Sequence, residues 1–257
     1  MNRAIFQKIH YVILLLLILA SCTHKEADLP RAVIKGKYLP FEEYIFLNRV
    51  TSNNITMLDS ADLTEGKPFT FKVNANDFTI HRLAHKELYP LMIIIRNGDT
   101  VEITQVEDRA WPYRVKGSAE CMLLVDYLER LNRDHYKVDS LAAIFHYSQD
   151  HPQFLAIRDH LNEEFKRMLD EHKAFAREFV TRYPSSLASV VVINGFFKEF
   201  ALFNSNDDFS YYELVDNALM NRMPENKHVK DFHQQVENIR AANEYELEAK
   251  MRLSPGR

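Results

Sequence analysis

The stretch Tyr113-Arg-Val-Lys-Gly-Ser118 marks a change in the pattern of apolar residues, and this change decides the fold. Up to Lys116, short runs of alternating apolar and polar residues predict β-strands, and Tyr113–Lys116 is the last of them. A glycine and a serine then break the strand pattern, and apolar residues begin to recur every three or four positions. The sequence therefore predicts an α+β fold, with an N-terminal antiparallel β sandwich or barrel-like domain at 32–117 and an all-helical segment at 118–250.

Upstream of this stretch the pattern indicates short strands joined by turns, as in a sandwich or small barrel. Pro68–Val73 alternates strictly between apolar and polar residues, as a half-buried strand does. Tyr89–Ile95 is almost entirely apolar and suggests a central strand. Asn97-Gly98 separates it from Thr100–Thr104 and predicts a hairpin. The full set of expected strands is 32–38, 43–48, 55–59, 68–73, 89–95, 100–104 and 113–116.

Downstream of the same stretch we expect helices. The longest candidate, residues 152–182, carries one continuous apolar stripe formed by Phe154, Ile157, Leu161, Phe165, Met168, His172, Phe175 and Phe179. Tyr183-Pro184 should end it, because proline disfavours helical backbone in the preceding residue. Ser118 is expected to cap the first helix, and Ser185 or Ser186 the helix after the proline. The expected helices are 119–131, 152–182, 187–203, 211–222 and 228–250.

The N-terminal residues have the layout of a bacterial lipoprotein signal. Arg3 and Lys8 precede the apolar run Tyr11–Ala20, which is short for a membrane-spanning helix and ends just before Cys22. We therefore predict a signal peptide at 1–21, with lipid attached to Cys22 of the mature protein. Residues 22–31 would form a tether, and residues 251–257 a C-terminal tail.

This signal predicts a location in the bacterial cell envelope, anchored to a membrane by the lipid on Cys22. Thr23 follows the cysteine where an aspartate would favour inner-membrane retention in some bacteria, so we expect the outer membrane. The periplasmic and the surface-exposed face are both open at this stage. Several buried acyl chains would make the anchor strong.

The charge balance excludes some partners. The formal net charge is −4, and loss of Arg3 and Lys8 with the signal peptide would make it −6, with 30 basic and 36 acidic residues remaining. Nucleic-acid binding requires a basic face, so we expect no nucleic-acid partner. The same balance disfavours attachment to anionic lipid by charge.

Cysteine use limits redox chemistry. The sequence has two cysteines, and if Cys22 carries lipid then Cys121 has no partner for an internal disulfide. Cys121 lies in an apolar helical run, so we expect a buried structural thiol rather than a reactive one, which would require exposure and nearby positive charge. Because the sequence contains no Cys-x-x-Cys, this chain alone cannot perform dithiol–disulfide exchange.

The sequence has 11 histidines, which suggests metal binding, but the spacing of the histidines does not match a metal-binding motif. His81 and His85 are four residues apart but lie in the β region without a third ligand, so we interpret them as solvated residues on a loop or edge. His160, Glu164 and His172 do not form a His-Glu-x-x-His motif, and we interpret His172 as a core or interface histidine. We predict no metal and no cofactor.

Other polar and aromatic clusters have ordinary explanations. The acidic pairs Glu163-Glu164, Asp170-Glu171 and Asp207-Asp208 are expected on solvated surfaces. Ser185-Ser186 lacks the Gly-x-Ser-x-Gly context of a nucleophile. No catalytic residues are therefore predicted. The aromatic residues Phe196, Phe197, Phe200, Phe203, Tyr211 and Tyr212 have helical spacing and are expected in the core, with an exposed groove for a peptide or partner domain as the alternative.

Several short motifs together resemble a known family. They are Gly36-Lys-Tyr38, Phe69-Thr-Phe71, Asn97-Gly-Asp-Thr-Val-Glu-Ile103, Val115-Lys-Gly-Ser118 and Tyr183-Pro-Ser-Ser-Leu-Ala-Ser189, placed after the lipoprotein signal. The combination resembles the N-terminal accessory region of TlpA-like thiol–disulfide oxidoreductase lipoproteins of the Bacteroidota. In that family a β domain of unknown function and a helical segment precede a thioredoxin-like domain. We expect the present sequence, which ends about where that domain would begin, to lack the catalytic cysteines.

Two functions from different classes follow. The first is a lipid-anchored, non-catalytic binding or scaffold module with a protein or peptide partner in the envelope. The second is the accessory half of a redox enzyme whose thioredoxin-like domain is missing or carried by another chain. A hydrolase that uses serine or histidine is a weaker third possibility, because no catalytic constellation surrounds either residue type.

Overall fold

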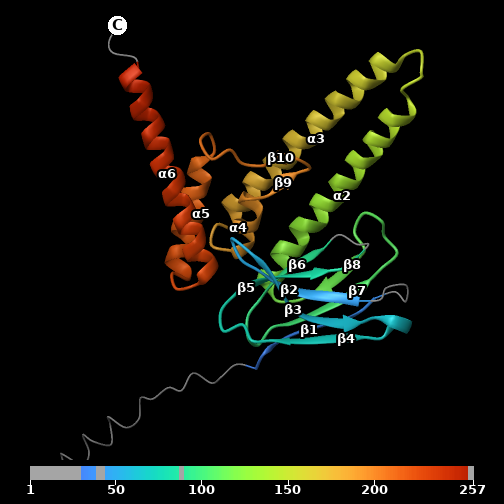
Figure 1. Ribbon diagram of the computed structural model, residues 1–257, viewed down its shortest axis with the longest axis vertical. Helices are drawn as coiled ribbons and strands as arrows, with labels where there is room; N and C mark the ends of the chain where they lie inside the picture. Colours follow the sequence, from blue (N-terminus) through green and yellow to red (C-terminus); the bar gives the residue numbers. More distant parts are fainter. Residues whose placement is uncertain (1–29, 39–43, 87–89, 254–257) are drawn as a thin grey trace, which may run out of the picture. The chain divides into compact units, whose positions relative to one another are not determined.

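The strands between residues 32 and 116 precede the long helices in the chain, as Figure 1 shows. The structure is a computed structural model and describes residues 30–38, 44–86 and 90–253. The described residues from Arg31 onward fall in one compact unit. The predicted α+β class is confirmed, with β-sheets in the N-terminal part and a helical segment after them.

Predictions that concern the two ends of the chain lie outside the described residues. The signal peptide at 1–21, the lipidation site Cys22 and most of the 22–31 tether are among them, as is the tail from residue 254 onward. Among the residues that are described, no helix is both long and apolar enough to cross a membrane.

The first sheet has the strand order β4-β1-β7-β8. Its strands are β1 (Ala32–Lys37), β4 (Phe69–Val73), β7 (Thr100–Gln105) and β8 (Tyr113–Lys116). β1 pairs with β7 in parallel, which departs from the purely antiparallel arrangement we predicted. Gly36 permits this close pairing, because a Cβ atom there would lie 2.2 Å from the carbonyl oxygen of Ile103.

The second sheet has the order β3-β2-β5-β6, with every pair antiparallel. Its strands are β2 (Tyr44–Val50), β3 (Ile55–Asp62), β5 (Thr79–Ala84) and β6 (Leu91–Ile95), and the 3-10 helix η1 (Thr64–Gly66) follows β3. Strand β5 was not predicted. Gly98 does form a turn with a positive φ of 91°, but the predicted hairpin is wrong. Because β7 pairs with β1 and β8, this turn carries the chain from one sheet to the other.

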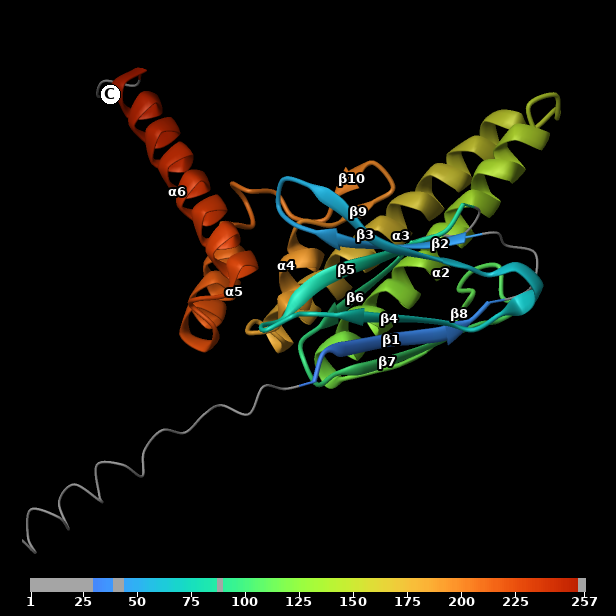
Figure 2. The same cartoon turned by 60° about the horizontal axis from the view of Figure 1, so that its bottom comes forward.

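The two sheets enclose a common apolar core, and Figure 2 shows them in separate layers. Ile34 of β1, Leu47 of β2 and Ile93 of β6 are almost fully inaccessible to solvent. Helix α2 (Ala119–Tyr147) contacts β6 and β8, and its Cys121 joins this core. The predicted sandwich is thus closed in part by the first helix.

The helical segment departs from the prediction in two places. Its other helices are α3 (Phe154–Arg182), α4 (Leu187–Ile193), α5 (Phe209–Arg222) and α6 (Lys227–Leu253). Helix α2 continues to Tyr147 instead of ending at Leu131, because its outer half packs against α3. The helix predicted at 187–203 ends at Ile193.

A short β-hairpin replaces the second half of that predicted helix. Strands β9 (Phe196–Phe197) and β10 (Phe200–Ala201) pair in antiparallel fashion, and Lys198 in their turn has a positive φ of 54°. The Gly195 carbonyl accepts a hydrogen bond from the Leu202 amide at 3.1 Å, which closes the hairpin. The segment is apolar on all sides, so periodicity alone could not distinguish the two structures.

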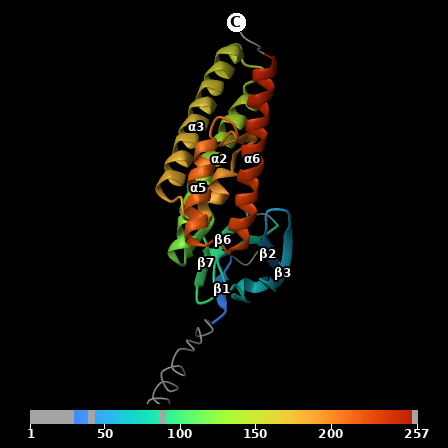
Figure 3. The ribbon, with the colours of Figure 1, turned by 90° about the vertical axis from the view of Figure 1, so that its left-hand side faces the viewer.

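The helices share a second core with strands of the sandwich, and Figure 3 shows them gathered on one side of the strands. Phe78, Ile80 and Ile94 belong to this core together with residues of α2–α6. The start of α6 is fixed to the sheet, since Asn226 Nδ2 donates to Phe78 O at 2.9 Å and to Asp77 Oδ2 at 2.7 Å. This junction positions the groove described next.

Candidate functional site

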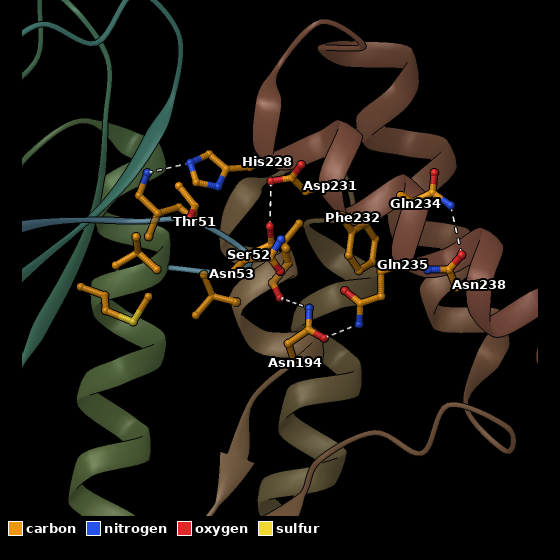
Figure 4. A pocket seen from close by; sticks show the side chains of 15 residues that line it. Thr51, Ser52, Asn53, Asn194, His228, Asp231, Phe232, Gln234, Gln235 and Asn238 are labelled. Carbon is orange, nitrogen blue, oxygen red and sulfur yellow. Dashed lines mark hydrogen bonds between the residues drawn. The ribbon is translucent and has the colours of Figure 1, made fainter. Parts of the chain in front are cut away.

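A groove lies where the β2–β3 turn, strands β5 and β6, helix α4 and the first half of α6 meet (Figure 4). Its volume is about 740 Å³. The residues that line it are Val50, Thr51, Ser52, Asn53, Ile80, Met92, Val190, Val191, Asn194, His228, Asp231, Phe232, Gln234, Gln235 and Asn238. Val50, Met92, Val190 and Val191 of the lining are partly buried against the helical core, and we call these four side chains the floor. Hydroxyl and amide groups form much of the rest.

The β2–β3 turn forms one wall of the groove. The amide of Thr51 donates to the carbonyl of Asn54 at 2.9 Å, and the Thr51 hydroxyl binds the backbone of Asn54 through both its amide and its carbonyl. This local bonding is typical of residues that form tight turns. It holds Ser52 so that its hydroxyl donates to Asp231 Oδ2 of α6 at 2.9 Å.

The N-terminal turn of α6 is capped and packed on β5. Asn226 Oδ1 accepts hydrogen bonds from the amides of His228, at 2.9 Å, and Val229, at 3.4 Å, which satisfies helix donors. His228 Nε2 accepts the Ile80 amide hydrogen at 3.3 Å, so the ring proton lies on Nδ1. Burial lowers the pKa of His228 below its usual value, and the ring is therefore neutral at pH 7.

Asp231 is the one charged side chain of the groove lining within the described residues. Burial raises the pKa of Asp231, but hydrogen bonds from Lys227 and Ser52 outweigh burial and hold that pKa below its usual value. Lys227 Nζ lies 3.0 Å from Asp231 Oδ2. An ionised carboxylate with these partners cannot act as a general acid at neutral pH.

Five amide side chains give the groove its hydrogen-bonding capacity. Gln235 Nε2 donates to Asn194 Oδ1 at 2.6 Å, and Gln234 Nε2 donates to Asn238 Oδ1 at 3.0 Å. The Asn53 side chain makes no hydrogen bond to any other described residue. Because each amide carries two donor hydrogens and an acceptor oxygen, every one of these five side chains has capacity left for a ligand.

Among the described residues that line the groove, no nucleophile is paired with a free base. Ser52 Oγ donates to a carboxylate, and the only imidazole nitrogen of His228 that could accept a proton already binds the backbone of Ile80. Acyl transfer needs a serine hydroxyl paired with a free base. The arrangement of hydroxyl, amide and aliphatic groups is suited to reversible binding.

The predicted structural thiol is confirmed at Cys121. Its side chain is fully buried. Burial raises the pKa of the Cys121 thiol to about 12, so almost no thiolate exists at neutral pH.

The interpretation of His81 as a solvated residue is wrong. His81 is 0% exposed on β5, and its Nε2 has no hydrogen-bond partner among the described residues. Burial lowers the pKa of His81 to about 4. His85 directly follows β5, and its ring lies 6.1 Å from that of Tyr38. His81 was misplaced because strand β5 carries a histidine and an arginine that hide its alternation.

The prediction for His172 as a core histidine is confirmed. It is 0% exposed and lies between Tyr127 Oη, 3.2 Å from Nε2, and Asp134 Oδ2, 3.1 Å from Nδ1. His160 and Glu164 lie elsewhere on α3, and Glu164 pairs with Arg167. Among the described residues, no group of three or more His, Cys, Asp or Glu side chains is placed to hold a metal ion.

Ser186 caps α4 as predicted, accepting the Ala188 amide at 3.1 Å. Ser118 occupies the corresponding position before α2, but its side chain does not cap the helix. Buried Glu120 supports the α4 cap, since its Oε1 accepts from the Ser186 hydroxyl and the Leu187 amide, both at 2.7 Å.

The acidic and aromatic pairs divide between surface and core. Asp208 is buried and lies 3.0 Å from Arg177, so its placement on a solvated surface was wrong. Of the aromatic group, Phe197, Phe203 and Tyr212 are in the core, as predicted. Phe196 and Phe200 are 55% and 41% exposed on the hairpin.

No protein-family model matches the chain, and no curated protein sequence matches it significantly. The resemblance to the accessory region of TlpA-like lipoproteins therefore stays a prediction.

Sequence reasoning missed the groove. Three of its five amides are Asn53, which lies in a turn beside Asn54, and the adjacent Gln234 and Gln235 on a helix. Such pairs are common in both settings, so the signal was weak. The groove forms only when the turn, α4 and α6 meet in space.

Proposed function

We propose that this protein is a lipid-anchored, non-catalytic binding module of the bacterial cell envelope, and that its ligand occupies the groove between the β2–β3 turn, α4 and α6. The anchor in this proposal is the lipid on Cys22 indicated by the N-terminal sequence. The groove supplies the binding surface.

One observation carries the proposal. The groove has about 740 Å³ of space, an aliphatic floor and five amide side chains with unused hydrogen-bonding groups. Ligand sites typically combine an apolar surface with a few polar groups that orient the ligand. The described polar groups of this groove can bind and orient, but they lack the paired nucleophile and base that turnover needs.

The alternative is the accessory half of a thiol–disulfide oxidoreductase, favoured by the sequence motifs that resemble the TlpA-like lipoproteins. In that case a thioredoxin-like domain supplied elsewhere would perform the redox step, since buried Cys121 is unsuited to it. Affinity purification of the full-length protein from its own membranes tests this alternative, which requires a thioredoxin-like chain to co-purify with it. No such chain is expected under the binding-module proposal.

The binding function can be tested with a fluorophore in the groove. Asn53→Cys places an exposed thiol on the turn, and protonated, buried Cys121 should not react with maleimide at pH 7. Asp150→Cys, in the exposed turn between α2 and α3, provides the matched control. Both are purified as full-length protein from membranes in detergent. The probes are a blocked random heptapeptide library and a panel of linear oligosaccharides.

We expect at least one class of ligand to change the fluorescence emission of the probe on Asn53→Cys in a saturable way. The same ligand should not change the emission of the probe on Asp150→Cys. Loss of this response in an Asn53→Cys background carrying Asn238→Ala would place the ligand in the groove. If neither peptides nor oligosaccharides change the emission at Asn53, the proposed function is wrong.

The proposed lipid anchor on Cys22 can be tested separately from the groove. Cys22→Ser should leave the protein without lipid, because acylation needs the thiol of that residue, and should release most of it from the membrane fraction. Each buried methylene contributes about 0.8 kcal/mol to membrane attachment, so the loss should be clear in fractionation. A variant that still sediments entirely with membranes would refute the lipidation of Cys22.

A further inference from the structure

Resting on the proposed function, we propose that the ligand is an extended, electrically neutral segment of polypeptide that lies along helix α6. The proposal follows from the length of the groove, its hydrogen-bonding groups, its lack of free charge and the chemistry of its floor.

The groove continues along α6 into a second hollow. This hollow has a volume of about 340 Å³ and shares Gln235 and Asn238 with the main groove. It adds Ile239, Ala242 and Asn243 of α6 together with Ser205 and Asn206 of the loop before α5. Lining residues at positions 235, 238, 239 and 242 lie on one face of the helix, at the spacing of successive turns.

The combined length suits a short extended chain. From His228 to Asn243 the helix rises about 22 Å, at 1.5 Å per residue. An extended peptide advances about 3.3 Å per residue, so some six or seven residues would fit beside it.

The exposed amides match the pattern of a peptide backbone. An extended chain presents carbonyl acceptors and amide donors in alternation. Within the described residues, Gln235 Oε1 and Asn238 Nδ2 have no partner, so one can accept from the ligand and the other can donate to it. Asn53 offers both kinds of group from the opposite wall.

Charge in the two hollows favours a neutral ligand. Asp231 is the only charged side chain among the described residues that line them, and Ser52 and Lys227 already bind its carboxylate. A charged side chain of the ligand that entered the groove would lose hydration without gaining an opposite charge, which is unfavourable. We therefore expect uncharged residues at the positions that contact the floor.

The floor favours peptide over sugar. Val50, Met92, Val190 and Val191 are partly buried aliphatic or thioether side chains, which suit the side chains of a peptide. Sugar rings are commonly held by stacking on an exposed aromatic face. The one aromatic residue of the described lining, Phe232, is 2% exposed and cannot present such a face.

The experiment screens a bead-displayed library of blocked random heptapeptides against the full-length protein in detergent. The test variant carries Gln235→Ala and Asn238→Ala. The matched control is Asn162→Ala, which removes an exposed amide from α3, outside both hollows. We expect the wild type and the control to enrich a family of uncharged sequences at least tenfold over the double variant.

Other outcomes separate the two proposals. Enrichment of charged sequences, or saturable binding of linear oligosaccharides in place of peptides, would overturn the peptide inference and leave the binding function intact. No binding of either probe would overturn both. If the double variant does not fold, as judged by circular dichroism, Asn238→Ala alone replaces it, because that exposed side chain makes a single hydrogen bond to other described residues.

Discussion

Two polar clusters built around a histidine differ in how fully their hydrogen bonds are satisfied. In the first, Tyr127 and Asp134 bind the two nitrogens of His172, and the histidine is 0% exposed. In the second, the groove, His228 and Asp231 are bound but the surrounding amides keep free groups that face solvent. We call the first the closed cluster and the second the groove cluster.

The difference separates polar residues that hold the fold together from polar residues that can bind a ligand. A buried polar group without a partner costs free energy, so the closed cluster resists any substitution that removes one member. Free groups at a solvent-facing site are satisfied by water until a ligand replaces it. Substitutions in the two clusters should therefore change stability by very different amounts.

The largest loss of stability should come from removing the Phe197 ring, which packs against His172 of the closed cluster. Phe197 is fully buried, and its ring centroid lies 5.1 Å from that of His172. Phe197→Ala should lower the free energy of unfolding by about 3–5 kcal/mol, because it leaves a cavity in the helical core. The measurement is denaturant unfolding followed by circular dichroism.

Its neighbour Phe196 supplies the control. That side chain is 55% exposed on the same hairpin, so Phe196→Ala should change the unfolding free energy by less than about 1 kcal/mol. Equal losses for the two variants would mean that the hairpin does not bind the core as described.

The second prediction concerns pH and adds a third kind of histidine to the comparison. His81 is buried like His172, but its Nε2 lacks a partner among the described residues. Burial lowers the pKa of His81 from 6.5 to about 4. Between these values the unfolded chain binds a proton that the folded chain does not, so stability falls as pH falls from 6.5 to 4.

A pKa lowered from 6.5 to about 4 corresponds to a loss of stability on the order of 3 kcal/mol, because each pKa unit is equivalent to about 1.4 kcal/mol. His81→Leu should remove it, which is measured by urea unfolding at pH 7 and pH 4.5. Burial also lowers the pKa of His172 and His228, so part of the acid sensitivity should remain. An unchanged pH slope in the variant would contradict the burial of a neutral His81.

The fold was predictable where local pattern determines it. The alternation at Phe69–Val73 and the apolar stripe of α3, including His172, identified a strand and a helix. Pairing between distant segments was not predictable in this way. The parallel β1–β7 pair depends on the space beside Gly36. The Asn97-Gly98 turn joins different sheets because β7 pairs with β1 and β8 and not with β6.

The candidate site was less predictable than the fold. Its defining contacts join Ser52 to Asp231 and Ile80 to His228, which are 179 and 148 residues apart in sequence. No local periodicity encodes such contacts. Ser186 and Cys121 could be interpreted correctly because their roles as cap and core thiol depend on immediate neighbours.

The third prediction tests the hydrogen bonds of the closed cluster. Tyr127→Phe keeps the ring packing but leaves His172 Nε2 buried without its partner. The unfolding free energy should fall by about 1–3 kcal/mol at pH 7. Tyr136→Phe on the same helix, where the ring is 41% exposed, should cause almost no change. Equal effects of the two substitutions would show that the hydroxyl of Tyr127 does not stabilise the fold.

The smallest effect should occur in the groove cluster. Gln234 and Asn238 bind each other at 3.0 Å on the exposed face of α6. Alanine is a better helix former than either residue, and surface substitutions of this kind change stability by about 0.5 kcal/mol or less. The variant with both residues changed to alanine should therefore unfold at the same denaturant concentration as the wild type. A loss of more than about 1 kcal/mol would show that these amides support the fold, and the free capacity on which the groove proposal depends would not exist.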